Sequence, residues 1–178
     1  AIASDLRQRS MGEADAPRDA DLIVVNTCTV THRADQQARQ AVRRLSRENP
    51  SARIVVTGCY AEREPLAAAA LDGVSLVIGN GVKARLGELV SDRSCRPDTP
   101  IVARPLRREA ALPLVEPIPV GTQTRPLVKL QDGCDARCSY CIVPRVRGPG
   151  RSVPPEAALR AIRGLVECGY QEIVLTGV

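Results

Sequence analysis

The sequence predicts an α/β protein made of two units, an open parallel sheet followed by the start of a second α/β unit. Short apolar runs alternate with helical patterns in the first half of the 178 residues, and this alternation returns after residue 126. Strands that are apolar on both faces and separated by helices are typical of a parallel sheet covered on both sides. A proline-rich segment separates the two units.

Three strands are expected in the first unit, at residues 22–25, 54–56 and 76–78. The segment 34–48 is predicted to be a helix, because its apolar residues recur at the spacing of one buried helix face. These residues are Ala34, Ala38, Ala41, Val42 and Leu45. Asn49 and the proline after it should end this helix.

Two further helical segments are expected in the first unit, an alanine-rich one after Pro65 and another near residues 83–90. In the second unit, residues 127–131 should form a strand, and a helix should begin near Pro155 and end by Gly169. A final strand at residues 173–175 completes a βαβ unit.

These elements divide the chain into residues 1–94, a linker at 95–125 and residues 126–178. The linker is inferred from proline, because seven of the 14 prolines lie between residues 97 and 126, and proline removes ladder donors and favours extended chain. Residues 1–9 read as the middle of a helix with no initiating Met, so we expect a fragment truncated at both ends.

Composition restricts the possible functions. Phe and Trp are absent and only three Tyr occur, which argues against stacked aromatic platforms for single strands. The net charge of +5 is compatible with a polyanionic partner, but charge alone favours a basic surface that only aids solubility, because the excess is small and not gathered into one run. No export signal and no apolar stretch of about 20 residues appears, so we expect a cytoplasmic protein without membrane contact.

Three of the seven cysteines, Cys134, Cys138 and Cys141, lie within eight residues on a loop that follows a predicted strand. Thiolates are the natural ligands of iron–sulfur clusters, and a trio leaves one iron of a four-iron cluster free to bind a substrate. A zinc site is less favoured, because no second Cys or His pair follows. Unrelated buried thiols are disfavoured by this density, and a disulfide scaffold by the missing export signal.

The pattern Cys-x3-Cys-x2-Cys resembles the radical S-adenosylmethionine superfamily, and the wider run LVKLQDGCDARCSYCIVPRVRGPGRS is similar to its methylthiotransferases. Upstream, VVNTCTVTHRADQQAR and VVTGCYAE resemble the amino-terminal domain of that family. NTCTVT, LQDGCDARCSYCIVP and LTGV are most similar to the branch that modifies threonylcarbamoyladenosine in tRNA. The resemblance implies an open-sheet methylthiotransferase domain that lacks its first strand, followed by the beginning of a radical S-adenosylmethionine (β/α) barrel.

By this resemblance, Cys134, Cys138 and Cys141 would hold a [4Fe-4S] cluster whose open iron binds S-adenosylmethionine. Tyr140 occupies the aromatic position that borders the adenine in the superfamily, although loop packing would explain it equally well. No side chain is assigned as a catalytic acid, base or nucleophile.

Cys28 and Cys59 match two of the three cysteines that hold a second [4Fe-4S] cluster in the family. Each follows an apolar strand, so both should emerge at the same carboxyl edge of the sheet, where open α/β sheets bind ligands. Two small core residues are the alternative. The third ligand is expected upstream of the chain, and Cys95 and Cys168 match no motif.

Arg137, Arg145, Arg147 and Arg151 lie in a stretch, residues 136–155, without acidic residues. Such arginines would suit contacts with tRNA or the cofactor, or could simply be solvated. The family often carries another Arg at the position of Val153, so a role resting on that Arg is in doubt.

The resemblance implies a tRNA methylthiotransferase that inserts a methylthio group at C2 of N6-threonylcarbamoyladenosine at position 37. The alternatives are an enzyme acting on isopentenyladenosine in tRNA or on an aspartate of a ribosomal protein, and a non-catalytic metal module that binds RNA. The 178-residue chain by itself is expected to be inactive.

Overall fold

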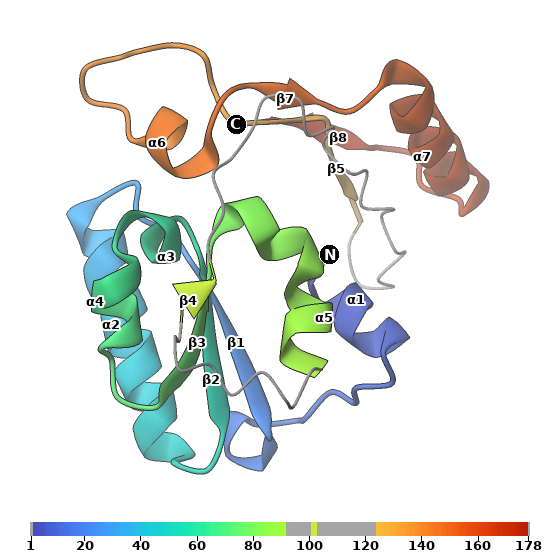
Figure 1. Cartoon of the computed structure of the whole chain (residues 1–178). Helices are drawn as coiled ribbons and strands as arrows, with labels where there is room; N and C mark the ends of the chain where they lie inside the picture. The colour runs from blue at the N-terminus through green and yellow to red at the C-terminus, as the bar shows by residue number, and fades with distance from the viewer. Residues whose placement is uncertain (1, 92–100, 103–123, 178) are drawn as a thin grey trace.

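The computed structural model describes residues 2–91, 101–102 and 124–177. Its first unit is a parallel sheet in the order β1-β2-β3-β4, formed by Leu22–Thr27, Arg53–Gly58, Val74–Ile78 and Ile101–Val102 (Figure 1). This confirms the predicted open parallel sheet. The short strand β4 lies within the segment predicted as a linker and pairs in parallel with β3.

Helices cover both faces of this sheet (Figure 1). On one face, α2, α3 and α4 pack over Ile54, Val56 and Val77. On the other, α1, α5 and the 3-10 helix η2 lie against Val55 and Leu76. These helices span Ile2–Gln8 (α1), His32–Glu48 (α2), Cys59–Arg63 (α3), Pro65–Ala69 (α4), Asn80–Arg85 (η2) and Leu86–Ser91 (α5), and a short 3-10 helix η1 spans Pro17–Asp19.

The central strands alternate in the face they present, so apolar residues on β2 and β3 are buried on both sides. Ile54, Val55, Val56 and Ile78 are all fully buried. Complete burial of a Val or Ile side chain contributes roughly 1.5–3 kcal/mol each. The first unit is therefore held together chiefly by aliphatic side chains, as the scarcity of aromatics requires.

The helix α2 agrees with the periodicity expected for residues 34–48. Thr31 caps it by accepting a hydrogen bond from the Ala34 amide at 3.1 Å. Ala38 and Val42 are buried against the sheet. At its end, the Asn49 side-chain amide donates to three backbone carbonyls of the segment before β1, including Ala20 O at 2.9 Å. These hydrogen bonds join the C-terminus of α2 to the segment that precedes β1.

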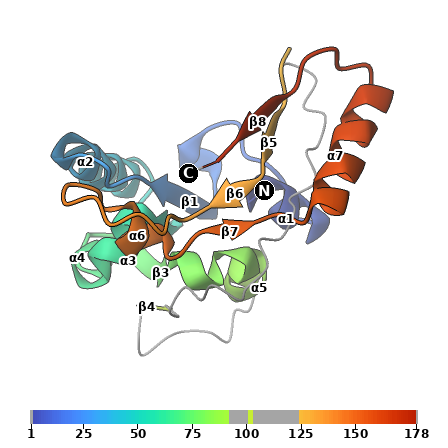
Figure 2. The ribbon, with the colours of Figure 1, turned by 90° about the horizontal axis from the view of Figure 1, so that it is seen from above.

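In the second unit, β5 (Leu127–Lys129) pairs in parallel with β8 (Val174–Thr176), and α7 (Pro155–Glu167) connects them. This is the predicted βαβ unit. The strand expected at 127–131 differs in one respect, because the chain changes partners at Leu130. Beyond that residue, β6 (Gln131–Asp132) pairs antiparallel with β7 (Arg151–Ser152), as Figure 2 shows.

The β6–β7 pair closes a loop from residue 133 to residue 150 that carries the cysteine trio and the short helix α6 (Val143–Arg147). Helix α6 lies beside α3 of the first unit (Figures 1 and 2). Val146 is 2% exposed there, and its carbonyl accepts a hydrogen bond from the Asn80 side chain at 2.7 Å. Within the described part of the chain, no helix is long and apolar enough to cross a membrane.

Candidate functional site

Cys28 and Cys59 follow the paired ends of two neighbouring strands. Thr27 at the end of β1 is in register with Gly58 at the end of β2, and each cysteine is the next residue. The prediction that both emerge at the same carboxyl edge of the sheet is therefore confirmed. Their environments differ, because Cys28 is exposed whereas Cys59 begins α3 and is 3% exposed.

Gly58 makes this edge possible. Its φ of 98° lies in the left-handed region that favours glycine, and a Cβ there would lie 2.3 Å from the Thr27 carbonyl oxygen. The strand can therefore turn directly into α3 while it stays close to β1. A residue with a side chain would push the two strand ends, and with them the two cysteines, apart.

Threonine hydroxyls tie the three strand ends together. Thr27 Oγ1 donates to the Thr57 carbonyl at 2.6 Å, and Thr57 Oγ1 donates to the Ile78 carbonyl at 2.8 Å. Both threonines are buried, so these bonds are sheltered from competing water. The carboxyl edge of the sheet is thereby cross-linked beneath the cysteines.

The loop that carries Cys28 is anchored through the next residues of NTCTVT. The Thr29 hydroxyl donates to the buried Asp35 carboxylate on α2. Arg63 at the end of α3 contacts the same carboxylate at 3.0 Å and Thr29 Oγ1 at 3.3 Å. Because Thr31 also caps α2, the exposed Cys28 thiol lies in a loop held on its carboxyl side.

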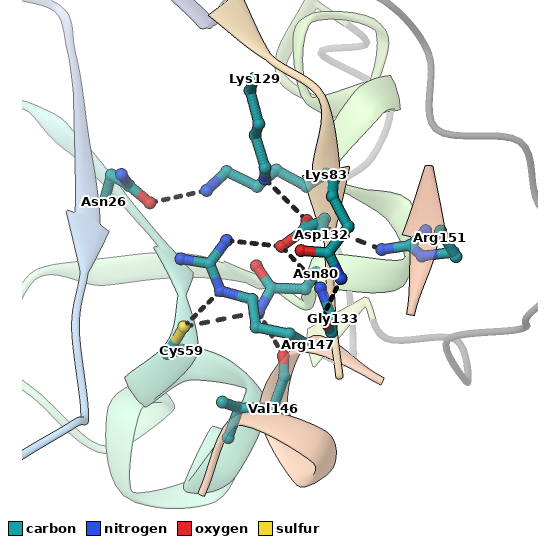
Figure 3. Close-up of polar contacts among 11 residues, drawn as sticks. Asn26, Cys59, Asn80, Lys83, Lys129, Asp132, Gly133, Val146, Arg147 and Arg151 are labelled. Atoms are coloured by element: carbon teal, nitrogen blue, oxygen red, sulfur yellow. Dashed lines mark hydrogen bonds and ion pairs between the residues drawn. The ribbon is translucent and has the colours of Figure 1, made fainter. Parts of the chain in front are cut away.

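The Cys59 sulfur faces the second unit. Arg147 on α6 donates a hydrogen bond from Nε to Cys59 Sγ at 3.0 Å (Figure 3). The Asn80 side-chain nitrogen lies 4.0 Å from the same sulfur while it binds the Val146 carbonyl. A cysteine of the first unit is thus in direct contact with the loop that carries the cysteine trio.

The two units meet at a junction, where α6 contacts α3 and Asn80. Asp132 is the acidic residue to which the basic side chains of this junction bind (Figure 3). Its carboxylate accepts from Arg147 at 3.1 Å and Lys129 at 2.8 Å, and Arg151 lies 3.7 Å away. Burial would raise the pKa of Asp132, but its hydrogen bond with Lys129 and the three positive charges outweigh burial and lower the pKa. Asp132 therefore stays ionised and holds these cations around the start of the cysteine loop.

Lys83 extends the positive cluster toward β1, and its Nζ donates to Asn26 Oδ1 at 2.7 Å. Burial and the charge of Arg147 lower the pKa of Lys83, although the Cys59 sulfur opposes the change. Burial also acts to lower the pKa of Arg147, but Cys59 and Asp132 outweigh it and the pKa is raised. Arg147 and Lys83 thus place positive charge near the Cys59 sulfur.

The cysteine trio lies in the loop that β6 and β7 close. Cys134 and Cys141 are half-buried and Cys138 is exposed. The Cys134 amide donates to the Gly148 carbonyl at 3.1 Å, and the Cys141 amide donates to the Cys138 carbonyl at 3.1 Å. Backbone contacts therefore shape both ends of the trio.

Three thiols on one short loop suit an iron–sulfur cluster by donor chemistry, and all three are free. The structure does not gather them into a ligand set, since no three His, Cys, Asp or Glu side chains in the described ranges converge on one metal position. The same holds for Cys28 and Cys59, which supply two donors at one edge. The donor type of these thiols fits an iron–sulfur cluster, but in the described residues their side chains do not surround one metal position.

The remaining candidate residues are distributed as follows. Tyr140 is 89% exposed and extends from the loop. Arg137 and Arg145 are exposed, whereas Arg147 and Arg151 turn inward to Asp132. Cys168 is exposed at the end of α7, and Cys95 lies outside the described residues.

Sequence reasoning missed three polar residues of the junction, Asp132, Asn80 and Lys83. Asp132 was open to detection, because it is the one acidic residue that directly precedes the Gly-Cys of the trio. Asn80 and Lys83 follow the third strand and carry no motif. The contact of Asn80 with Val146 depends on the approach of α6, because these two residues are 66 positions apart in the chain.

Two family models match separate parts of the chain. Residues 1–79 match the family described as "Uncharacterized protein family UPF0004", and residues 128–178 match the radical SAM superfamily. The structure of the radical S-adenosylmethionine methyltransferase TsrM from Kitasatospora setae has a similar fold, with a TM-score of 0.56 and 17% sequence identity. That similarity covers 99% of this chain and 39% of TsrM.

Several curated proteins are similar over most of the chain. Threonylcarbamoyladenosine tRNA methylthiotransferase MtaB is 37% identical in Aquifex aeolicus, over 89% of this chain, and 39% identical in Bacillus subtilis, over 92%. Ribosomal protein uS12 methylthiotransferase RimO from Desulfosudis oleivorans is 37% identical over 90% of the chain. The chain spans 38%, 36% and 37% of these three relatives, respectively. The two family matches, together with these relatives named as methylthiotransferases, show that the chain belongs to the radical S-adenosylmethionine methylthiotransferase family.

Proposed function

We propose that the protein is a tRNA methylthiotransferase that inserts a methylthio group at C2 of N6-threonylcarbamoyladenosine at position 37. The observation that carries this proposal is the similarity to relatives named for that nucleoside, at 37% and 39% identity over about nine-tenths of the chain. The proposed substrate is tRNA, and the enzyme would work in the cytoplasm.

The proposed cofactors are two [4Fe-4S] clusters and S-adenosylmethionine. Cys134, Cys138 and Cys141 would hold the first cluster, and the missing fourth thiolate would leave an iron position open for S-adenosylmethionine. Together these groups would supply radical chemistry that removes hydrogen from the substrate carbon. The role of the loop is to present the three thiolates beside the first unit.

Cys28 and Cys59 would supply ligands to the second cluster, the source of the inserted sulfur. Their support is positional, because both follow strand ends paired at Thr27 and Gly58 and both lie at the edge where open sheets bind ligands. The contact of Cys59 with Arg147 brings this edge against the loop of the trio.

Tyr140 is proposed to border the adenine of S-adenosylmethionine. It adjoins Cys141, and its exposed ring is free to pack on a bound ligand. Arg137 and Arg145 are exposed on the same loop, within the stretch 136–155 that contains no acidic residue, and are proposed to contact tRNA phosphates.

The proposal is tested by the nucleosides of a strain in which the gene is deleted. Mass spectrometry of digested tRNA should show that the methylthio form of threonylcarbamoyladenosine disappears, while threonylcarbamoyladenosine without the methylthio group accumulates. The intact gene should restore the modification, and a gene encoding Cys138→Ala should not. Persistence of the methylthio nucleoside in the deletion strain would refute the assignment.

A ribosomal protein is the second candidate substrate, because a uS12 methylthiotransferase is also 37% identical to the chain. The same strain distinguishes the two substrates. If the tRNA nucleosides are unchanged but the mass of ribosomal protein uS12 falls by one methylthio group, the enzyme belongs to the ribosomal branch. Loss of a methylthio group from isopentenyladenosine would place it in the third branch.

A further inference from the structure

Arg147 contacts both units at the junction. Its Nε donates to Cys59 Sγ at 3.0 Å, and its Nη1 donates to Asp132 Oδ1 at 3.1 Å (Figure 3). Cys59 begins α3 of the first unit, whereas Asp132 lies on β6, two residues before Cys134. One guanidinium therefore connects a proposed ligand of the second cluster to the strand that leads into the proposed ligands of the first.

Both ends of this connection are held in place. Cys59 is 3% exposed, so its sulfur has little freedom to move away from the guanidinium. Asp132 is fixed by Lys129 at 2.8 Å as well as by Arg147. The backbone of α6 is fixed one residue before Arg147, where the Val146 carbonyl accepts from Asn80 at 2.7 Å. The contacts of Arg147 and of the helix backbone beside it therefore hold the guanidinium in place.

Arginine has properties that suit contact with a metal-bound sulfur. It remains charged at every physiological pH, and its planar fork can donate to two acceptors at once. Hydrogen bonds to the sulfurs of an iron–sulfur cluster, and the charge around the cluster, set its reduction potential. The Arg147 side chain is 30% exposed, so solvent screens its interaction with Cys59 only partly.

We propose that Arg147 is a positioning residue: it orients the Cys59 sulfur at the junction and donates an N–H to it while that sulfur holds iron. The donated bond and the positive charge stabilise the reduced, more negative cluster and raise its reduction potential. This inference rests on the proposed function, in which Cys59 is an iron ligand.

The contact itself is tested on the metal-free chain by a double-mutant cycle. Urea midpoints are measured for the wild type, Arg147→Gln, Cys59→Ala and the double variant. We expect the loss of stability in the double variant to be smaller than the sum of the two single losses, because each substitution removes the same hydrogen bond. Additive losses would show that the two side chains do not interact and would overturn the inference. If Arg147→Gln does not fold, Arg147→Lys replaces it, because lysine keeps the charge but lacks the fork.

The effect on the cluster is tested in the full-length protein with Cys134, Cys138 and Cys141 replaced by Ala, so that only the second cluster remains. Its reduction potential is measured by redox titration followed by electron paramagnetic resonance. Arg147→Gln should shift the potential to a more negative value, and Arg147→Lys should produce a smaller shift. Arg160→Gln is the control, because Arg160 is an exposed arginine on α7 to which no role is assigned, and it should leave the potential unchanged.

Iron analysis of Cys59→Ala in the same background distinguishes a failure of the role proposed for Arg147 from a failure of the proposed second cluster site. If Cys59→Ala loses iron but Arg147→Gln leaves the potential unchanged, the role of Arg147 is refuted while the proposed function stands. If Cys59→Ala retains all of its iron, Cys59 is not a ligand, and the proposed second cluster site is refuted together with the inference.

Discussion

At the scale of single residues, the described cysteines differ mainly in their neighbours. Cys59 is buried and receives a hydrogen bond from Arg147, whereas Cys28, at the same edge of the sheet, is exposed. Cys134 and Cys141 are half-buried in their loop. Cys168 is exposed at a helix end with no motif around it. Cys138, the remaining proposed ligand, is also exposed, and Cys168, to which no role is assigned, provides a natural control.

Replacing any one of Cys134, Cys138 and Cys141 by Ala should abolish binding of the first cluster, because two thiolates hold a four-iron cluster poorly. After anaerobic reconstitution, each variant should contain about four fewer irons and about four fewer sulfides per chain than the wild type. Cys168→Ala should retain the wild-type content. Equal iron in the wild type and in all three variants would contradict the assignment of this loop.

Lys83 gives a prediction for the dependence of stability on pH. Its pKa is lower in the folded chain than in the unfolded chain, chiefly through burial, so the folded state disfavours its charged form. This destabilisation is fully present below the folded pKa and disappears as the pH rises to the unfolded value of about 10.4.

Lys83→Met should therefore gain stability relative to the wild type near pH 8 and lose that relative gain as the pH approaches about 10.4. Urea unfolding of the two proteins across this range measures the difference. A difference that is independent of pH would show that the environment of Lys83 does not disfavour its charge. Loss of the bond to Asn26 affects the size of the difference but not its change between the two pH limits.

At the scale of elements, the turn from β2 into α3 places Cys59. Gly58 has a φ of 98° there, and any Cβ would meet the Thr27 backbone. Gly58→Ala should destabilise the chain by about 1–3 kcal/mol from the backbone conformation alone, with a further cost from the contact. The urea midpoint measures this loss.

Gly164→Ala is the matched control for this substitution. Gly164 lies inside α7, and a Cβ there would have no neighbour within 4 Å. Alanine in a helix interior is favoured over glycine by roughly 0.5–1 kcal/mol, so this variant should be more stable than the wild type. Similar effects of the two substitutions would contradict a special role for the backbone at Gly58.

At the scale of the whole molecule, α6 joins the two units by its contacts with α3 and Asn80. Asn80→Ala removes the hydrogen bond to the Val146 carbonyl and leaves that buried acceptor without its partner. Amide hydrogen exchange should accelerate in residues 143–147, while exchange in β2 and β3 should stay slow, because the core of the sheet does not depend on this bond.

Arg85→Ala serves as the comparison for Asn80→Ala. Arg85 lies in the same 3-10 helix, but its ion pair is a local one with Glu88. Mass spectrometry should therefore show wild-type exchange in α6 for this variant. Equal protection of α6 in Asn80→Ala and the wild type would show that other contacts hold the units together.

Most of the fold was predictable from local patterns. The apolar runs and the helical spacing at Ala38 and Val42 determine which side chains must leave water, and this requirement alone produces a parallel sheet with helices on both faces. The strand after residue 126 was predicted as one element, yet it changes partners at Leu130. That change depends on where β7 and β8 approach, which no local pattern records.

The chemistry of the candidate site was likewise determined by the sequence, because the spacing of Cys134, Cys138 and Cys141 and the strand-end positions of Cys28 and Cys59 are properties of the chain itself. Only the tertiary structure decided that Cys59 is buried against Arg147. It also decided that Arg147 faces Asp132, although the sequence favoured contacts of this arginine stretch with tRNA or the cofactor. The physical reason is the range of the interactions. Periodicity and spacing reflect neighbours along the chain, whereas the partner of a charged side chain depends on which distant segment folds against it.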